Sequence, residues 1–219
     1  MSLLLKEERQ LVADYGRQLL ADGLTRGSSG NISIFRPDKG LYAISPTGVP
    51  YEEVKAEDVV IMDLDGQVVD GHYKPSSEHE LHRIFYRERD DIKAVVHTHS
   101  PACAAYSCLR KTLPPFHYMI AVAGPDVRCA DYASYGTHDL AVNAYEAMKD
   151  RKAVLLANHG LVAGGANIAE AYNIASELEY MCDIYSIAKT FEDEPVILDQ
   201  AEMDSMAERF KTYGQPQKL

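Results

Sequence analysis

The chain has 219 residues, of which 46% are hydrophobic, and this is enough to bury a sizeable core without disulfides. Its formal net charge of −11 at pH 7 argues against non-specific binding to nucleic acid or to anionic membranes, whereas a local pocket for a phosphorylated small molecule is compatible with this charge. No apolar run approaches the roughly 20 residues that a bilayer-spanning helix needs, so no membrane partner is expected.

The first third of the chain predicts a helix followed by antiparallel strands. Apolar residues recur at helical spacing from Lys6 to Leu24, where Gly23 supplies a stop. Asp65-Gly66 is a strong two-residue hairpin signal between two apolar runs. The expected strands follow a turn-rich loop within 26–35, and continue over 41–45, 59–64 and 67–70.

The rest of the chain alternates between helical and extended patterns. A stripe of Leu81, Ile84 and Phe85 predicts a helix over 78–88, with Ser76 or Ser77 as its cap. Strands are expected over 93–99, 153–158 and 161–164, and helices over 101–109, 137–149, 168–190 and 200–211, with a loop around 117–118. This pattern predicts one α/β domain over 1–219, with a central mixed, largely antiparallel β-sheet flanked by helices.

Four scattered cysteines indicate the compartment. They form no C-x-x-C pair and lie among small or apolar neighbours, which is typical of reduced thiols rather than of a disulfide framework or a zinc ribbon. The N-terminal residues become charged too early for a secretory signal peptide. We therefore expect a cytoplasmic protein.

Three histidines form the strongest functional signal in the chain. His97 and His99 end an apolar run with one residue between them, and His159 ends a similar run. Because successive side chains of a strand point to opposite faces, His97 and His99 project from the same side. Three neutral imidazoles suit zinc and leave a coordination position open, which is typical of a catalytic site.

Glu78 has two interpretations. It stands at the predicted start of a helix after two serines, where backbone N–H groups favour anions. Near a Lewis-acid metal, its carboxylate would serve as a ligand at rest and as a base in turnover. The alternative is an ordinary acid that caps the helix N-terminus, and the sequence leaves both interpretations open.

Three separate turns are rich in glycine and hydroxyl groups: Gly27–Asn31, Ser45–Gly48 and Pro75–Ser77. Hydroxyls, an amide and exposed backbone N–H groups enclose a phosphate without net positive charge, although each turn alone is compatible with an ordinary loop. None of the turns matches the glycine spacing of a nucleotide or dinucleotide loop, so ATP and NAD are not expected.

Two of the fourteen tyrosines are candidates for proton transfer. Tyr118 lies in the segment 116–121, and Tyr213 lies near the C-terminus. A phenol close to a metal delivers a proton to a developing alkoxide. Their spacing is equally compatible with ordinary packing, in which the hydroxyl is hydrogen-bonded.

Taken together, these motifs resemble the class II aldolase/adducin family over nearly the whole chain. The matching motifs are Gly30-Asn31, Ser45–Gly48, Pro75–Glu78, His97–His99 and Asn158–Gly160. Segments 116–124 and 211–214 are most similar to the branch that cleaves L-fuculose 1-phosphate. The chain departs from that branch at Thr98, where the family often has Asn, and at Asn158, where it often has His.

The resemblance implies a role for each candidate residue. It assigns His97, His99 and His159 to Zn²⁺, with Glu78 as a further ligand in the resting site and as the acid/base in catalysis. It assigns Gly30, Asn31, Thr47, Gly48, Ser76 and Ser77 to the phosphate. Tyr118 would reach a neighbouring subunit's site as a proton donor, and Tyr213, in a mobile tail from about residue 211, would shape aldehyde selection.

The resemblance also implies an activity, an assembly and several alternatives. The expected enzyme is a homotetramer, with active sites at subunit interfaces, that reversibly cleaves a ketose 1-phosphate such as L-fuculose 1-phosphate to dihydroxyacetone phosphate and an aldehyde such as L-lactaldehyde. Related activities are methylthioribulose-1-phosphate dehydration, ribulose-5-phosphate 4-epimerisation and decarboxylation of a sugar-acid phosphate. The epimerases typically place Asp where this chain has Glu78, which favours the aldolase. An adducin-like interaction module without metal is the alternative of another class.

Overall fold

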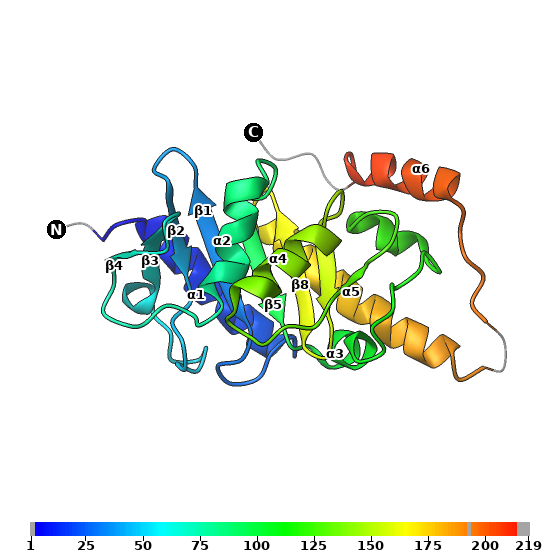
Figure 1. The fold of residues 1–219 in the computed structure, drawn as a ribbon, viewed down its shortest axis with the longest axis horizontal. Helices are drawn as coiled ribbons and strands as arrows, with labels where there is room; N and C mark the ends of the chain where they lie inside the picture. Colours follow the sequence, from blue (N-terminus) through cyan, green and yellow to red (C-terminus); the bar gives the residue numbers. More distant parts are fainter. Residues whose placement is uncertain (1–2, 192–193, 214–219) are drawn as a thin grey trace.

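One eight-stranded sheet forms the centre of the computed structural model, which describes residues 3–191 and 194–213 (Figure 1). The strand order is β4-β3-β2-β1-β5-β8-β7-β6, and all neighbours are antiparallel except β6 and β7. The strands are β1 (Asn31–Arg36), β2 (Leu41–Ile44), β3 (Val60–Asp63), β4 (Val68–Asp70), β5 (Ala94–Thr98), β6 (Cys129–Ala130), β7 (Ala153–Leu156) and β8 (Gly160–Gly165).

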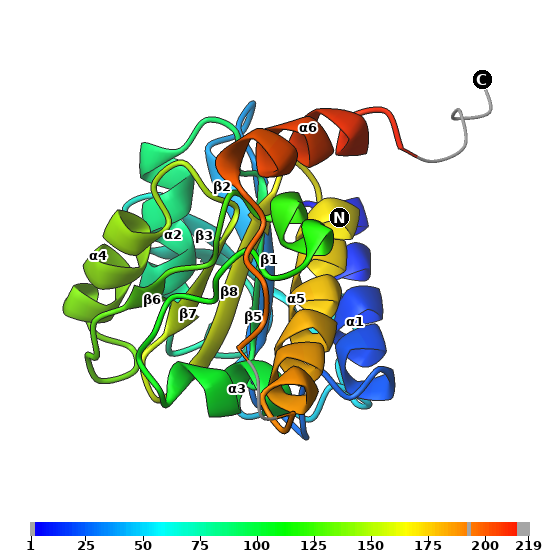
Figure 2. The ribbon, with the colours of Figure 1, turned by 90° about the vertical axis from the view of Figure 1, so that its right-hand side faces the viewer.

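Helices cover both faces of the sheet (Figure 2). The α-helices are α1 (Lys6–Ala21), α2 (His79–Glu88), α3 (Pro101–Ser107), α4 (His138–Ala147), α5 (Ile168–Ala188) and α6 (Gln200–Phe210), and the 3₁₀ helices are η1 (Ala56–Asp58) and η2 (Tyr118–Val122). Helices α2 and α4 lie on one face, and α1 and α5 on the other. None of the described helices is both long and apolar enough to cross a membrane.

Strand β5 lies at the centre of the sheet and is buried on both faces. Ala94 and Val96 pack into the core beneath α1 and α5, whereas Val95 packs into the core beneath α2 and α4. Since side chains alternate along a strand, His97 continues the face of Val95 and points towards α2. The alternation of the core therefore determines which helix layer supplies the partners of His97.

Side-chain caps explain where three of the helices begin. Thr137 accepts a hydrogen bond from the backbone N–H of Leu140 at the start of α4, and Asn167 does the same for Glu170 at the start of α5. Asp199 caps α6 in this way. Such caps satisfy backbone donors that have no partner within the helix.

The predicted fold class is confirmed, with corrections at the ends of several elements. The hairpin at Asp65-Gly66 is present, and Gly66 takes the positive φ of 85° that the turn requires. The serine cap predicted for α2 is wrong, because the helix begins at His79 with Glu78 in the N-cap position. The loop expected at 117–118 is wrong at Tyr118, which is the first residue of η2, and the two-residue strand β6 was not expected.

The extent of the domain and the behaviour of the tail stay predictions. Most of the predicted tail, residues 214–219, lies outside the described residues.

Candidate active site

Glu78, His97, His99 and His159 form one cluster. Their ligand atoms all lie within 4.8 Å of one another. The Nε2 atom of His99 lies 3.0 Å from the Nε2 atoms of both His97 and His159. Glu78 Oε2 lies 3.3 Å from His97 Nε2, and Glu78 Oε1 lies 3.6 Å from His159 Nε2. The structure therefore brings together the three histidines and the carboxylate that the sequence singles out.

The strand pairing explains how residues far apart in sequence meet here. His97 lies opposite Asn31 of β1 on one side and opposite Val162 of β8 on the other. His159 immediately precedes β8, and its backbone N–H donates to Ser107 Oγ over 3.2 Å. Gly30 enters β1 with a φ of 71°, and a Cβ at this position would lie 2.6 Å from the carbonyl oxygen of His97. Only glycine fits this approach to the histidine strand.

Glu78 does not act as a helix cap. It occupies the N-cap position of α2, but its side chain makes no capping hydrogen bond. One carboxylate oxygen, Oε2, accepts a 2.9 Å hydrogen bond from Asn31 Nδ2, and the side chain points towards His97 and His159. This geometry removes the capping interpretation and leaves the carboxylate as part of the cluster.

The electrostatics of the cluster favour an ionised carboxylate at Glu78 and neutral imidazoles at His99 and His159. Burial opposes the ionisation of Glu78, but His97, His159 and Asn31 together hold the pKa of this carboxyl well below its usual range. Burial lowers the pKa of His99 and that of His159 to about 4, with a further contribution from His97. At neutral pH these two rings therefore carry free lone pairs.

His97 is held by a backbone contact. Its Nδ1 lies 2.9 Å from the carbonyl oxygen of Leu161, which can only accept, so Nδ1 carries the proton and Nε2 faces the cluster. Burial alone would lower the pKa of His97, but the adjacent Glu78 carboxylate outweighs burial and raises it. A backbone carbonyl on the distal nitrogen is the usual arrangement for a metal-binding histidine.

The residues of the cluster fit a metal ion. Among the described residues, Glu78 Oε1 is one of two buried side-chain polar atoms without a hydrogen-bond partner. Leaving a buried oxygen unpaired costs free energy, and a cation between it and the imidazole nitrogens would satisfy it. Three imidazoles and one carboxylate form a donor set that suits zinc and related divalent metals.

A cavity of about 420 Å³ opens in front of the cluster. Five of the six residues predicted to bind phosphate line it: Gly30, Asn31, Thr47, Ser76 and Ser77. The sixth, Gly48, follows Thr47 with a φ of 72° but is not part of the lining. The three predicted loops therefore converge on one cavity that also contains Glu78, His99 and His159.

Two exposed tyrosines at this cavity were missed in the sequence. Tyr132 and Tyr135 line the cavity together with the loop residues. The guanidinium of Arg110 lies 5.6 Å from the ring centre of Tyr132 and donates a 2.7 Å hydrogen bond to Asn158 Oδ1. The segment 131–137 has no regular periodicity, so no pattern in the sequence points to these rings.

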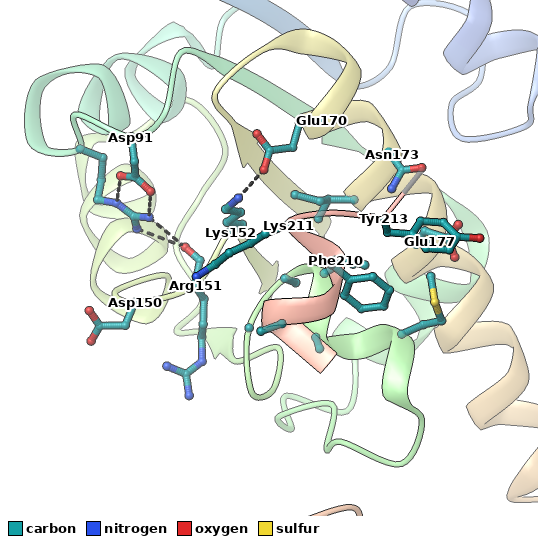
Figure 3. Close-up of a pocket in the computed structure, with 18 of the residues that line it drawn as sticks. Asp91, Asp150, Arg151, Lys152, Glu170, Asn173, Glu177, Phe210, Lys211 and Tyr213 are labelled. Carbon is teal, nitrogen blue, oxygen red and sulfur yellow. Dashed lines mark hydrogen bonds and ion pairs between the residues drawn. The ribbon is translucent and has the colours of Figure 1, made fainter. Parts of the chain in front are cut away.

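Tyr118 and Tyr213 do not line the cavity in front of the cluster. Both line an open groove of about 1310 Å³ beside η2, α5 and α6. Figure 3 shows Tyr213 and Phe210 among the residues that line this groove, together with Glu177 and Asn173 of α5. The side chains of Tyr118 and Tyr213 are well exposed. Their predicted roles at a neighbouring subunit's site stay predictions.

Behind the cluster, Asn31 contacts a histidine that lies outside the cluster, His82. The Asn31 Oδ1 atom lies 2.5 Å from His82 Nε2, and His82 is fully buried. Burial lowers the pKa of His82 to about 3, with a further contribution from His97. This ring was not predicted to belong to the site, although it lies four residues after Glu78 on α2 and therefore on the same helix face.

The buried His82 predicts a dependence of stability on pH. Because its pKa is about 3 in the folded state, against 6.5 for an unperturbed histidine, the unfolded chain binds more protons between these values. Stability is therefore full well above pH 6.5 and falls as the pH is lowered, with a slope from this group that approaches about 1.4 kcal/mol per pH unit between the two pKa values. In urea unfolding of metal-free protein between about pH 7 and 4.5, His82→Gln should show a shallower pH slope than the wild type. Equal slopes would refute this, and the exposed His138→Gln serves as the control.

Comparisons with known proteins identify the family of the chain. The family model described as Class II Aldolase and Adducin N-terminal domain matches residues 10–186. A relative from Bacillus thuringiensis serovar kurstaki, named 5-deoxy-D-ribulose 1-phosphate aldolase, is 51% identical over 97% of this chain and 100% of its own length. The L-fuculose phosphate aldolase of Escherichia coli K12 is 39% identical over 95% of this chain and 96% of its own length.

A solved structure supports the same assignment at the level of the fold. The structure titled L-fuculose 1-phosphate aldolase superposes with a TM-score of 0.92 at 50% identity, and the match covers 96% of this chain and 98% of that one. The family match spans well over half of the chain, and the 51% identical relative is covered over its full length. The chain therefore belongs to the class II aldolase and adducin family and is an enzyme of its aldolase branch, whose members are lyases.

Proposed function

We propose that this enzyme is a zinc-dependent aldolase of the cytoplasm that reversibly cleaves a deoxyketose 1-phosphate to dihydroxyacetone phosphate and an aldehyde. The proposed substrates are L-fuculose 1-phosphate, which yields L-lactaldehyde, and the close analogue 5-deoxy-D-ribulose 1-phosphate. The two substrates carry the same phosphorylated end, and the relatives named above are aldolases for one or the other.

The observation that carries the proposal is one cavity with two chemically different walls. Imidazoles and the Glu78 carboxylate form one wall, and hydroxyls, an amide and glycine backbone form the other. No lysine or arginine is among the described residues that line it. Neutral hydroxyl and N–H donors suit a phosphate, and imidazoles with a carboxylate suit a metal ion.

The chemistry follows from what each wall supplies. Bound zinc would act as a Lewis acid that stabilises the negative charge developing on the ketose when its C3–C4 bond breaks. Glu78 would hold the proton exchanged with the carbon of the dihydroxyacetone phosphate half, because its Oε2 is fixed by Asn31 while Oε1 has no hydrogen-bond partner among the described residues. The described lining contains no lysine, so an amine-based mechanism would have no nucleophile here.

Product analysis separates this function from the related ones. With purified protein loaded with zinc, we expect dihydroxyacetone phosphate and a three-carbon aldehyde from L-fuculose 1-phosphate, and a two-carbon aldehyde from 5-deoxy-D-ribulose 1-phosphate. A dehydratase would retain all carbons and lose water, an epimerase would return an intact sugar phosphate, and a decarboxylase would release CO₂ from a sugar acid. Any of these outcomes without dihydroxyacetone phosphate would contradict the proposal.

A mixing experiment tests the proposed role of Tyr118 in a neighbouring subunit of a homotetramer. Tyr118→Phe should lower kcat without changing zinc content, because Tyr118 lines the outer groove and not its own metal cavity. Oligomers assembled from equal amounts of Tyr118→Phe and Glu78→Gln subunits should regain activity in about a quarter of their sites, where an intact Glu78 meets an intact partner tyrosine.

The interpretation of that experiment depends on verified mixing. Mass spectrometry of differently tagged subunits would establish that mixed oligomers form. Oligomers of Tyr118→Phe alone provide the baseline activity. No recovery in verified mixed oligomers would show that Tyr118 does not act across the interface.

Tyr213→Phe should change aldehyde preference more than zinc content, and an unchanged preference would remove its proposed role.

A further inference from the structure

A line of buried hydrogen bonds runs from the metal cluster into the core between α2 and β1. Glu78 Oε2 contacts Asn31, Asn31 contacts His82, His82 Nδ1 lies 2.6 Å from Ser33 Oγ, and Ser33 Oγ lies 2.5 Å from the hydroxyl of Tyr86. Each of the five side chains is at most 6% exposed. Of these five residues, only Glu78 also belongs to the histidine cluster.

The spacing of these residues explains why they form a line. Glu78, His82 and Tyr86 are separated by four residues each, so they lie along one face of α2. Asn31 and Ser33 are separated by two residues on β1, so both point towards that face. The polar stripe of the helix and the polar residues of the strand therefore interleave.

The carboxylate at one end fixes the direction of every proton in the line. The carboxylate of Glu78 only accepts, so Asn31 must turn its Nδ2 towards it and its Oδ1 towards His82. Oδ1 only accepts, so His82 must carry its proton on Nε2. Its Nδ1 then accepts from Ser33, and Ser33 in turn accepts from Tyr86. The opposite imidazole tautomer would leave Nε2 facing Oδ1 without a proton.

An imidazole at this place is costly for the core. Leu81 and Phe85 beside it on α2 pack against apolar neighbours, whereas His82 buries two polar nitrogens. Burying polar groups is tolerated only when all of them are hydrogen-bonded, and it gives less stability than an apolar side chain of similar volume. Both nitrogens of His82 are bonded here, so the gain is in orientation.

We propose that His82 is a positioning residue, which in its Nε2–H tautomer holds Asn31 so that the amide N–H fixes Glu78 Oε2 and leaves Oε1 directed at the metal. This inference rests on the proposed function for its catalytic consequence. Asn31 also lines the phosphate cavity, so His82 sets the orientation of a residue that serves both walls of the site.

Three variants separate positioning from packing. His82→Gln keeps a donor and an acceptor at a spacing close to that of the ring nitrogens, whereas His82→Leu removes both. Tyr86→Phe is the matched core control, because it removes a hydroxyl from the far end of the same line and keeps the ring. Outer partners of metal ligands typically contribute about 10- to 100-fold to metal affinity or activity.

Two of the readouts do not depend on activity. Long-range ¹H–¹⁵N NMR of the wild type, with His82 assigned from its loss in His82→Gln, should show the Nε2–H tautomer both with and without zinc. Zinc competition against a chelator should show about a 10- to 100-fold loss of affinity in His82→Leu, with His82→Gln and Tyr86→Phe close to the wild type. The kcat values for ketose phosphate cleavage should follow the same order.

The outcomes distinguish this inference from the proposed function. An Nδ1–H tautomer, or equal losses of zinc affinity in His82→Leu and Tyr86→Phe, would overturn the positioning role even in an active aldolase. A wild type with the expected tautomer and affinities but no aldolase activity would overturn the proposed function and leave the orientation of the metal ligand by His82 in place.

Discussion

Replacing Glu78 with glutamine is expected to lower kcat for ketose phosphate cleavage by about 10²- to 10⁴-fold, the usual contribution of a positioned acid or base. The substituted amide oxygen can still accept the hydrogen bond from Asn31. The amide nitrogen then takes the place of Oε1, and it presents donors where the carboxylate presents a lone pair. Glutamine therefore keeps the shape of the site and removes the group that we propose exchanges the proton.

Steady-state kinetics and zinc content measured on the same sample test this expectation. Glu80→Gln is the matched control, because Glu80 lies two residues away in the first turn of α2 and pairs with Arg83 rather than with the cluster. Its kcat should stay near that of the wild type. A Glu78→Gln enzyme that turns over at the wild-type rate would refute the acid/base role.

Replacing His159 with alanine is expected to weaken zinc binding by more than the roughly 10- to 100-fold that is typical for loss of an outer partner. His159 contributes one of three imidazole nitrogens, and its Nε2 lies 3.0 Å from that of His99. Burial also keeps the pKa of His159 at about 4, so the wild-type ring is ready to bind metal at neutral pH. Activity should fall together with zinc content and should recover in part at high zinc concentration.

The control for this variant is another histidine outside the cluster. His138 begins α4 with a well-exposed side chain, 3.9 Å from Glu80, so His138→Ala should keep its zinc and its activity. Atomic absorption on dialysed samples measures the zinc content. Full zinc occupancy in His159→Ala, or equal losses in both variants, would contradict the assignment of His159 as a ligand.

The histidine cluster could be predicted from the sequence because its geometry is local to two strands. The spacing of His97 and His99 places both side chains on one face of a strand, and His159 ends the run that leads into the neighbouring strand. His99 lies just past the end of β5, yet its Nε2 still meets that of His97. The place of Glu78 in the cluster needed the structure, because its position at a helix start is equally compatible with a cap.

Other parts of the site depend on packing that leaves little trace in the sequence. Strand β6 has only two residues, too few for a period, and its parallel pairing with β7 is set by the chain that leads to it. Tyr132 and Tyr135 reach the cavity from an irregular loop. By contrast, the stripe of Glu78, His82 and Tyr86 has helical spacing, so the pattern was readable, but only contact with β1 gives it meaning.

The most direct test of the whole account is the zinc dependence of dihydroxyacetone phosphate formation from L-fuculose 1-phosphate and 5-deoxy-D-ribulose 1-phosphate. The metal-free protein, prepared with a chelator, should form none from either substrate, and added zinc should restore cleavage in proportion to the occupied sites. Dihydroxyacetone phosphate formed at the full rate without metal, or none formed by the zinc-loaded protein from either substrate, would contradict the account.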